Sequence, residues 1–337
     1  MDAEELQRRR EERAAARRRR RIRRRAGIGG TLAVVVIAVA VAIAAASGSG
    51  GATGVTTAKR TQSTATTPHA KARPRPGAGR HVRGESTASI LGPATGVRGT
   101  ASVPVLMYHV IAAPPSHAPF PGLYVLPQEF AAQMQALKKA GWRAVTLDQL
   151  QAYWTKGAKL PAGKPIVITF DNGYHSQYTE ALPVLRKMGW VADENMQLSG
   201  LPPSQGGLTT SEVKDMVNAG WELDTQGISH ADLITLDAAQ LHDQIDSARK
   251  TIQRRYGVPV NWFCYPSGHY DTTVINAVRA AGYIGSTTVI PGWAGPSSDP
   301  YRLPRLRVLG GTSPTSLLTQ IADNRTATAP PGSYGGA

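Results

Sequence analysis

The chain has 337 residues and a formal net charge of +15, a length that allows one large domain or two smaller ones. The charge lies in the first part, because residues 1–25 carry +7, residues 26–100 carry another +7, and residues 101–337 carry only +1. A nucleic-acid-binding domain would have a basic face of its own, so this distribution excludes nucleic acid as the partner.

The N-terminal residues predict a membrane anchor. Residues 28–46 are uncharged and mostly apolar, close to the roughly 20 residues that a helix needs to cross a bilayer. Residues 1–27 are rich in arginine, which predicts that they stay in the cytoplasm and that the rest of the chain lies outside it. We therefore expect a single-pass protein of the cell membrane with an uncleaved signal anchor. A signal peptide cleaved near residues 44–47 and a cytoplasmic hydrophobic helix are the alternatives.

Residues 47–100 are expected to form a disordered linker. They are rich in Gly, Ser, Thr, Ala and Pro and contain few large apolar side chains, so they cannot bury enough surface to offset the entropy of ordering. Such a tether suits a domain that works in or under a cell wall, and its basic residues could also bind anionic wall polymers or lipid headgroups. The Pro- and Gly-rich residues 325–337 are predicted to be disordered as well.

Residues 101–324 alternate between strand and helix patterns. Strands are expected at 103–110, 143–145, 166–170, 222–225, 261–265, 285–289 and 306–308. Helices are expected at 128–140, 146–154, 237–257, 274–281 and 314–323. Two further helices are expected, one that ends at residue 188 and one that begins at residue 209. Thr209 and Glu212 form a capping box at the start of one helix.

Four helix-to-strand joints share one device, a glycine followed by a large aromatic residue. These pairs are Gly141-Trp142, Gly189-Trp190, Gly220-Trp221 and Gly282-Tyr283. The glycine can take the left-handed conformation that ends a helix, and the aromatic residue packs back on the last turn. Repeated joints of one kind predict an α/β fold, a parallel (β/α) barrel. A doubly wound open sheet is the alternative, which the absence of a Gly-rich nucleotide loop disfavours.

Polar residues follow the predicted strands. They include His109 after the first, Asp171, Asn172 and His175 after the third, Gln226 and His230 after the strand at 222–225, and His269 after the next. In a parallel barrel these loops open on one face, so we expect a site there. Cys264, the only cysteine, is interpreted as a buried structural thiol.

Five motifs in this order resemble those of the polysaccharide deacetylases, the NodB-homology family. They read VPVLMYHVI at 103–111, TFDNGY at 169–174, SHADL at 229–233, FCYPSG at 263–268 and YRLPR at 301–305. The resemblance spans roughly residues 103–318. It implies a distorted (β/α) barrel of about seven parallel strands, and as substrate an acetylated polysaccharide such as peptidoglycan or another N-acetylglucosamine polymer.

The resemblance also implies roles for single residues. Asp171 matches the general base, His230 matches one ligand of a divalent metal (often zinc), and Arg305 matches the arginine that pairs with the base and orients it. A plain helix cap is the alternative role for Asp171. The substrate-binding residues are expected to be His109, Tyr174, Tyr265 and Pro266.

Two metal-ligand positions depart from the family pattern. Asn172 stands where a second aspartate binds the metal, and Gln226 stands where the first histidine of an HxxxH pair is expected. Zinc selects nitrogen, sulfur and carboxylate donors, and amide oxygens are poor substitutes. The pattern therefore predicts a weak or absent metal site. It leaves three interpretations open: a hydrolase with impaired catalysis, a glycan-binding protein without catalysis, and a metal site rebuilt from His230 with His109, His175 or His269.

Overall fold

The computed structural model describes residues 96–201, 206–326 and 329–336. The predicted cytoplasmic segment at 1–27, the predicted anchor at 28–46 and the predicted linker up to residue 95 lie outside these residues. Within the described part of the chain, no helix is both long and apolar enough to cross a membrane.

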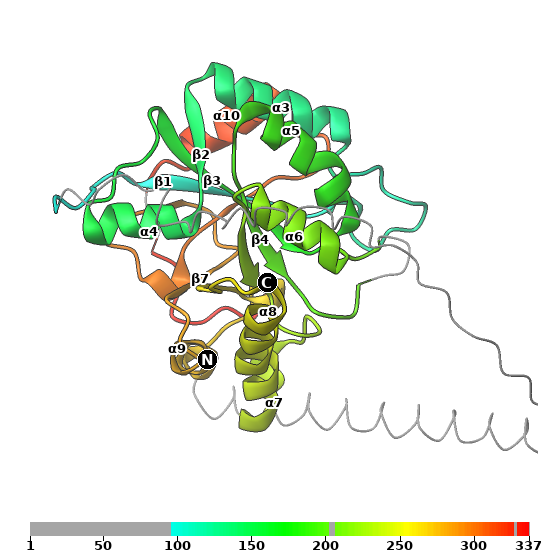
Figure 1. Ribbon diagram of the computed structural model, residues 1–337, viewed down its shortest axis with the longest axis vertical. Coiled ribbons are helices and arrows are strands. Elements are labelled where there is room, and N and C mark those ends of the chain that lie inside the picture. The colour runs from blue at the N-terminus through cyan, green and yellow to red at the C-terminus, as the bar shows by residue number, and fades with distance from the viewer. Residues whose placement is uncertain (1–95, 202–205, 327–328, 337) are drawn as a thin grey trace, which may run out of the picture. The chain divides into compact units, whose positions relative to one another are not determined.

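Helices and strands alternate along the domain, as the sequence predicts (Figure 1). The strands are β1 (Val103–Tyr108), β2 (Trp142–Val145), β3 (Lys164–Asn172), β4 (Asp193–Met196), β5 (Glu222–Thr225), β6 (Trp262–Cys264), β7 (Gly285–Thr287), β8 (Trp293–Ala294) and β9 (Leu306–Arg307). The helices are α3 (Pro127–Lys139), α4 (Leu147–Lys156), α5 (Leu182–Met188), α6 (Thr210–Asn218), α7 (Ala238–His242), α8 (Ala248–Tyr256), α9 (Thr272–Ala280) and α10 (Pro314–Asp323). Short π-helical segments precede α5 at Gln177–Ala181 and join α7 to α8 at Asp243–Ser247.

The strands form one curled sheet that is parallel except at one strand. Its order is β7-β6-β5-β4-β3-β1-β8, with β2 added to β3 and β9 added to β1. β8 runs antiparallel to β1. Beyond β7 the pairing reduces to an isolated parallel bridge between Thr287 and Leu303. The expected parallel α/β architecture is confirmed, whereas the expected number of about seven strands is corrected to nine among the described residues, because the sequence patterns predict neither β4 nor the short strand β8.

The glycines of the four helix-to-strand joints all have the predicted left-handed conformation. Their φ angles are +82° at Gly141, +64° at Gly189, +89° at Gly220 and +84° at Gly282. The aromatic residue after Gly220, Trp221, stacks on Phe170 of β3 with ring centroids 5.1 Å apart. The joints therefore end the helices and also fill the core behind the central strand.

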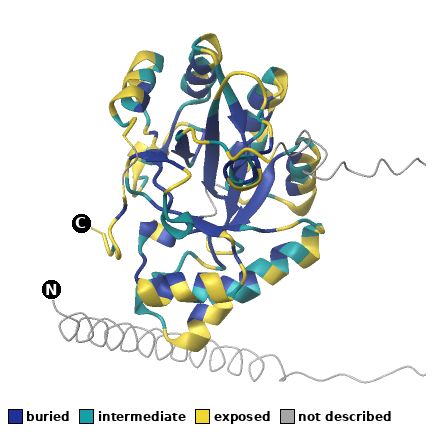
Figure 2. Ribbon diagram, turned by 90° about the vertical axis from the view of Figure 1, so that its left-hand side faces the viewer, coloured by how far each residue is buried: buried dark blue, intermediate teal, exposed yellow. Residues whose placement is uncertain are grey.

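The central strand β3 separates an apolar face from a polar interior. Ile166, Ile168 and Phe170 belong to the apolar cluster that also contains residues of α3, α5 and α10. Side chains alternate along a strand, so Asp171 points to the opposite face from Phe170. Figure 2 shows the strands buried between helices whose outer surfaces are exposed.

The sequence analysis missed strand β4. Its residues Asp193, Glu194, Asn195 and Met196 are all buried, yet two acids and an amide in four residues do not follow the pattern of a buried strand. β4 is nevertheless paired in parallel with both β3 and β5. Asp193 and Asn195 of β4 therefore point to the same face of the sheet as Asp171, and Asn195 lies directly beside it.

The C-terminal residues pack on the domain where they are described. The sequence predicted disorder over 325–337, but Tyr334 exchanges two backbone hydrogen bonds with Tyr270, each 2.8 Å long. The Tyr270 hydroxyl also donates to the backbone oxygen of Pro331. Backbone pairing of this kind, which composition alone does not reveal, holds residues 329–336 against the domain.

Candidate active site at the mouth of the sheet

A cavity of about 830 Å³ opens at the carboxyl ends of the strands. Most of the predicted site residues line it: His109, Asp171, Asn172, Tyr174, Gln226, His230 and Tyr265. Pro266 is buried and does not line the cavity, and Arg305 lies behind Asp171. The mouth predicted from the strand ends is therefore present.

Asp171 is held by a buried arginine. Arg305 Nη1 donates to Asp171 Oδ1 at 2.7 Å and Nη2 donates to Oδ2 at 2.9 Å. The remaining donors of this guanidinium bond to Thr169 Oγ1, to the backbone oxygen of Thr288 and to Cys264 Sγ. Arg305 is only 1% exposed, so the pair is a fully desolvated, two-point ion pair. The carboxylate of Asp171 therefore pairs with Arg305, and the alternative that it caps a helix is wrong.

Two further side chains contact the Asp171 carboxylate. Asn195 Nδ2 of β4 donates to Oδ1 at 2.9 Å, and the Cys264 thiol of β6 approaches Oδ2 at 3.4 Å. Cys264 is buried and free, as predicted. The sequence analysis did not find Asn195; the residue lies directly opposite Asp171 in the register of β3 and β4, but β4 itself was not predicted.

The pKa of Asp171 reflects these contacts. Burial by itself would raise that pKa, but the charge and hydrogen bonds of Arg305 outweigh burial and hold it well below its ordinary value. Asp171 is therefore an ionised carboxylate at any physiological pH. A carboxylate with so low a pKa is also a weak proton acceptor.

His109 lies beside Asp171. Its Nε2 is 3.9 Å from Asp171 Oδ2. Burial lowers the pKa of His109 to about 4, with Arg305 and Arg307 acting in the same direction against the attraction of Asp171. The imidazole is therefore neutral near pH 7. Its Nδ1 atom is buried and has no hydrogen-bond partner among the described residues.

The three positions that hold a metal in the family carry weak donors here. Asn172 uses its Nδ2 to donate to Gln197 Oε1 at 2.7 Å. The Oε1 atom of Gln226 is buried without a partner among the described residues. Burial lowers the pKa of His230, so its imidazole is neutral. Two amides and one imidazole supply no negative charge, and this donor set does not fit zinc.

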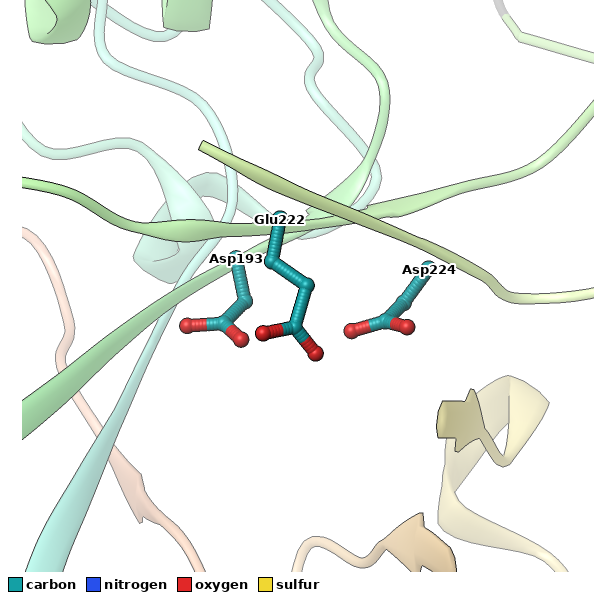
Figure 3. A group of neighbouring side chains, drawn as sticks. All are labelled: Asp193, Glu222 and Asp224. Atoms are coloured by element: carbon teal, nitrogen blue, oxygen red, sulfur yellow. The ribbon is translucent and has the colours of Figure 1, made fainter. Parts of the chain in front are cut away.

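The histidines do not rebuild a metal site in the described part of the chain. His175 pairs with Glu212 at 3.2 Å, and His269 pairs with Asp232 at 3.1 Å. Among the described residues, one group of three His, Cys, Asp or Glu side chains converges closely enough to hold an ion, namely Asp193, Glu222 and Asp224 (Figure 3). Asp193 and Glu222 are the first residues of β4 and β5, and Asp224 lies two residues further along β5, in register with Asn195.

Backbone strain is concentrated at the cavity. Four non-glycine residues of the described chain have a left-handed φ: His117 (66°), Asn172 (83°), His230 (52°) and Ser267 (56°). All four line the same cavity. Residues are held in such conformations at a free-energy cost, and they cluster at functional sites. Two of the positions where the resemblance implies metal ligands, Asn172 and His230, thus have a strained backbone.

A proline-rich loop forms one wall of the cavity. Pro114, Pro115, Pro119 and Pro121 stiffen the segment, which carries Phe120 at its tip with 68% of its surface exposed. The base of the loop is tied to the sheet by the hydrogen bond from Val110 N to the Leu123 backbone oxygen. The sequence analysis did not assign this loop a role, since only its position in the fold brings it to the mouth.

The predicted substrate-binding residues differ in accessibility. Tyr174 is half-buried and faces the cavity. Tyr265 is fully buried, donates its hydroxyl to the Tyr301 backbone oxygen and stacks on Tyr270 at 4.9 Å. Tyr265 therefore contributes an edge of the cavity wall and leaves no free ring face for a sugar.

Comparisons with known proteins agree on one family. The family model for polysaccharide deacetylase matches residues 158–285. YxkH of Bacillus subtilis (strain 168), assigned to the polysaccharide deacetylases, is 30% identical over 213 residues, which are 63% of this chain and 74% of that protein. The peptidoglycan-N-acetylmuramic acid deacetylase PdaA of the same strain is 28% identical over 131 residues, 36% of this chain and 44% of PdaA.

A solved structure gives the same result. The deacetylase PplD of Streptococcus pyogenes, in complex with acetate, superposes with a TM-score of 0.60 at 26% identity over 66% of this chain and 99% of PplD. The fold, the order of the motifs and these relatives agree: the chain belongs to the polysaccharide deacetylase family.

Proposed function

We propose that this chain binds acetylated polysaccharide of the cell wall at the mouth of the sheet, and that its hydrolysis of acetyl groups from amino sugars is impaired. The observation that carries the proposal is a contrast within one cavity. Asn172 and His230 have a strained, left-handed backbone, whereas two of the three positions where the resemblance implies metal ligands carry neutral amides.

Glycan binding is supported by unsatisfied polar groups on residues that line the cavity. Buried polar atoms in folded proteins are nearly always hydrogen-bonded. Gln226 Oε1 and His109 Nδ1 are buried and have no partner among the described residues, and both residues line the cavity. An acetamido sugar offers an N–H donor, a carbonyl acceptor and hydroxyl groups, with which these two side chains could pair once they turn toward the cavity.

Impaired catalysis is supported by the donors at the metal positions and not by the groups that could move a proton. Asp171 is ionised and paired with Arg305, as the resemblance implies for the general base, so this pair does not by itself impair catalysis. His109 is neutral and adjacent to it, so it could accept a proton in a slow reaction. The donor set of Asn172, Gln226 and His230 does not fit the metal on which the family typically depends.

The substrate class is supported by the relatives. PdaA is named for the N-acetylmuramic acid of peptidoglycan, and an Escherichia coli (strain K12) protein with 37% identity over 60 residues is a poly-beta-1,6-N-acetyl-D-glucosamine N-deacetylase. Both act on acetylated amino-sugar polymers, as their names state. We extend this class to the present chain.

Membrane anchoring is a further part of the proposal and depends on residues 28–46. Their uncharged composition and the arginines before them support a single-pass anchor with an extracytoplasmic domain. Membrane fractionation of expressing cells followed by N-terminal sequencing tests it. Recovery of the chain in the soluble extracytoplasmic fraction with a new N-terminus near residue 47 would contradict it.

The binding and catalytic parts are tested with the purified full-length chain. Retention on insoluble peptidoglycan or chitin is expected, and Gln226→Ala should weaken it while Gln135→Ala, on the exposed face of α3, should not. Acetate release should be slow in the unmodified chain and faster in Asn172→Asp/Gln226→His. Retention without any acetate release would favour the pure glycan-binding protein. No retention on either polymer would contradict the proposal.

A further inference from the structure

The charges that line the cavity are unbalanced. Of the described residues that line it, Asp171 is the one acid and Arg307 is the one arginine or lysine. The Asp171 carboxylate is already neutralised by the two hydrogen bonds from Arg305. The histidines at positions 109, 117 and 230 add no negative charge. A ligand in this cavity therefore meets one uncompensated positive charge, that of Arg307.

Arg307 is positioned by the sheet and its side chain is free to meet a ligand. It is the last residue of β9, in register with Met107 of β1, and its backbone oxygen accepts a hydrogen bond from Gln320 Nε2. The side chain is exposed, and among the described residues no carboxylate forms an ion pair with it. Its charge nevertheless reaches the site, because it helps to lower the pKa of His109.

The wall near Arg307 is apolar. Leu309, two residues on, is 43% exposed, and Phe120 is 68% exposed. Both residues line the cavity, and Leu309 lies beside Gly122 of the proline-rich loop. An apolar surface next to a cation suits a sugar ring that carries an acidic substituent, since the ring can lie on the side chains while the acid meets the guanidinium.

We propose that Arg307 is a specificity-determining residue that binds a carboxylate on the glycan, so that the cavity prefers an acetylated glycan with acidic sugars to a neutral one. The inference rests on the proposed function and adds the charge of the substrate to it. The planar guanidinium can bond both oxygens of a carboxylate. Asp171 is the one acid among the described residues that line the cavity, and its pairing with Arg305 keeps it from repelling such a group.

The experiment compares two forms of one ligand. The acidic probe is a peptide-free oligosaccharide of alternating N-acetylglucosamine and N-acetylmuramic acid, and the neutral probe is the methyl ester of the same oligosaccharide. Calorimetric titration of the full-length protein at low salt measures both affinities. We expect the acid to bind about two- to fivefold more tightly than the ester, the range for a partly exposed ion pair, and the difference to shrink with added salt.

Variants then assign the preference to one side chain. Arg307→Gln should abolish the difference between acid and ester, and Arg307→Lys should keep part of it. Arg254→Gln removes an exposed arginine of α8 that does not line the cavity, and it should keep the whole difference. Because only the backbone of Arg307 makes a hydrogen bond within the described fold, these variants should fold normally.

Two outcomes would overturn the inference alone: equal affinity of the unmodified protein for acid and ester, or a preference that persists in Arg307→Gln. Tight binding of a phosphorylated glycan but not of the carboxylate would also refute it, because the proposal names a carboxylate. Failure of the unmodified protein to bind either oligosaccharide would instead contradict the proposed glycan binding, and the inference with it.

Discussion

Two groups of buried carboxyl side chains lie on one face of the sheet in different electrostatic surroundings. At the mouth, Asp171 faces Arg305 and Asn195. The lower group consists of Asp193 and Glu222, the first residues of β4 and β5, together with Asp224 (Figure 3). The backbone amides of Leu147, Asp148 and Trp262 donate hydrogen bonds to these carboxyl groups. Asn195 is in register with both Asp171 and Asp224, so it lies between the two groups.

Burial raises the pKa of the acids in both groups, and the presence or absence of a neighbouring cation decides whether the net shift is downward or upward. The pKa values of Asp193, Glu222 and Asp224 are raised well above normal, because burial and neighbouring carboxyls disfavour the charged form. The pKa of Asp171 is lowered, since Arg305 outweighs burial. The surroundings of the lower group therefore favour the protonated form of its acids, whereas Asp171 is ionised. A cluster of buried acids does not by itself mark the reactive site; the charged partner and the open cavity do.

The largest expected effect breaks the pair at the mouth. Arg305→Met leaves a buried carboxylate without its cation, which should lower the free energy of unfolding by about 3–5 kcal/mol. Urea unfolding at pH 7 measures it. The double variant Arg305→Met/Asp171→Asn should recover much of the loss, since no buried charge remains.

A surface pair serves as the control for that prediction. Arg302 and Asp299 form a partly exposed ion pair at 2.9 Å, and Arg302→Gln should cost no more than about 1 kcal/mol. If Arg305→Met lowered the free energy of unfolding by as little as Arg302→Gln does, the buried ion pair would not be what stabilises the fold at the mouth.

The second prediction concerns pH and the lower group. The unfolded chain releases the protons of these acids near pH 4–5, whereas the folded chain retains them. Their contribution to stability is therefore full below about pH 4 and falls by up to roughly 1.4 kcal/mol per pH unit for each such group as the pH rises toward the folded pKa. Asp171 has the opposite sign: its contribution is present above about pH 4 and is lost as the pH falls.

Asp224→Asn separates these contributions. The amide keeps an oxygen to accept from Trp262 N but cannot ionise, so the free energy of unfolding between pH 5 and 8 should fall less steeply than in the unmodified protein. Asp243→Asn, at a carboxylate with 73% of its side chain exposed, should leave the slope unchanged. Equal slopes for Asp224→Asn and the unmodified protein would show that Asp224 does not retain its proton.

The smallest effect is expected at the residue between the groups. Asn195→Ala removes one hydrogen bond to Asp171 and should cost about 1 kcal/mol, because Arg305 still satisfies the same oxygen. Urea unfolding measures the cost, and a double-mutant cycle with Asp224→Asn tests whether the two groups are coupled. Strict additivity would mean that they act independently.

Much of the fold could be predicted from local patterns. The glycine–aromatic joints and the apolar run before Asp171 each predict one feature from neighbouring residues, and the structure contains both features. β4 could not be predicted, because its acids and its asparagine are buried only once β3 and β5 flank them. β8 has only two residues, too few to show any periodicity.

The site was predictable by position but not by contact. The strand ends located Asp171, Asn172, Gln226 and His230 at one mouth, which the cavity confirms. Asp171 contacts Asn195, which is 24 positions away in the sequence, and Cys264, which is 93 positions away. It also lies beside His109, which follows a different strand. Such contacts depend on sheet order and register, which motifs along the chain do not encode.

The central claim is that the mouth keeps its shape but has lost the donors for zinc. Zinc content after dialysis of the full-length protein against micromolar zinc tests this claim most directly. We expect no zinc that depends on His230 in the unmodified protein, and about one zinc per chain in Asn172→Asp/Gln226→His, lost again when His230→Ala is added. One tightly bound zinc per unmodified chain that His230→Ala removes would contradict the claim.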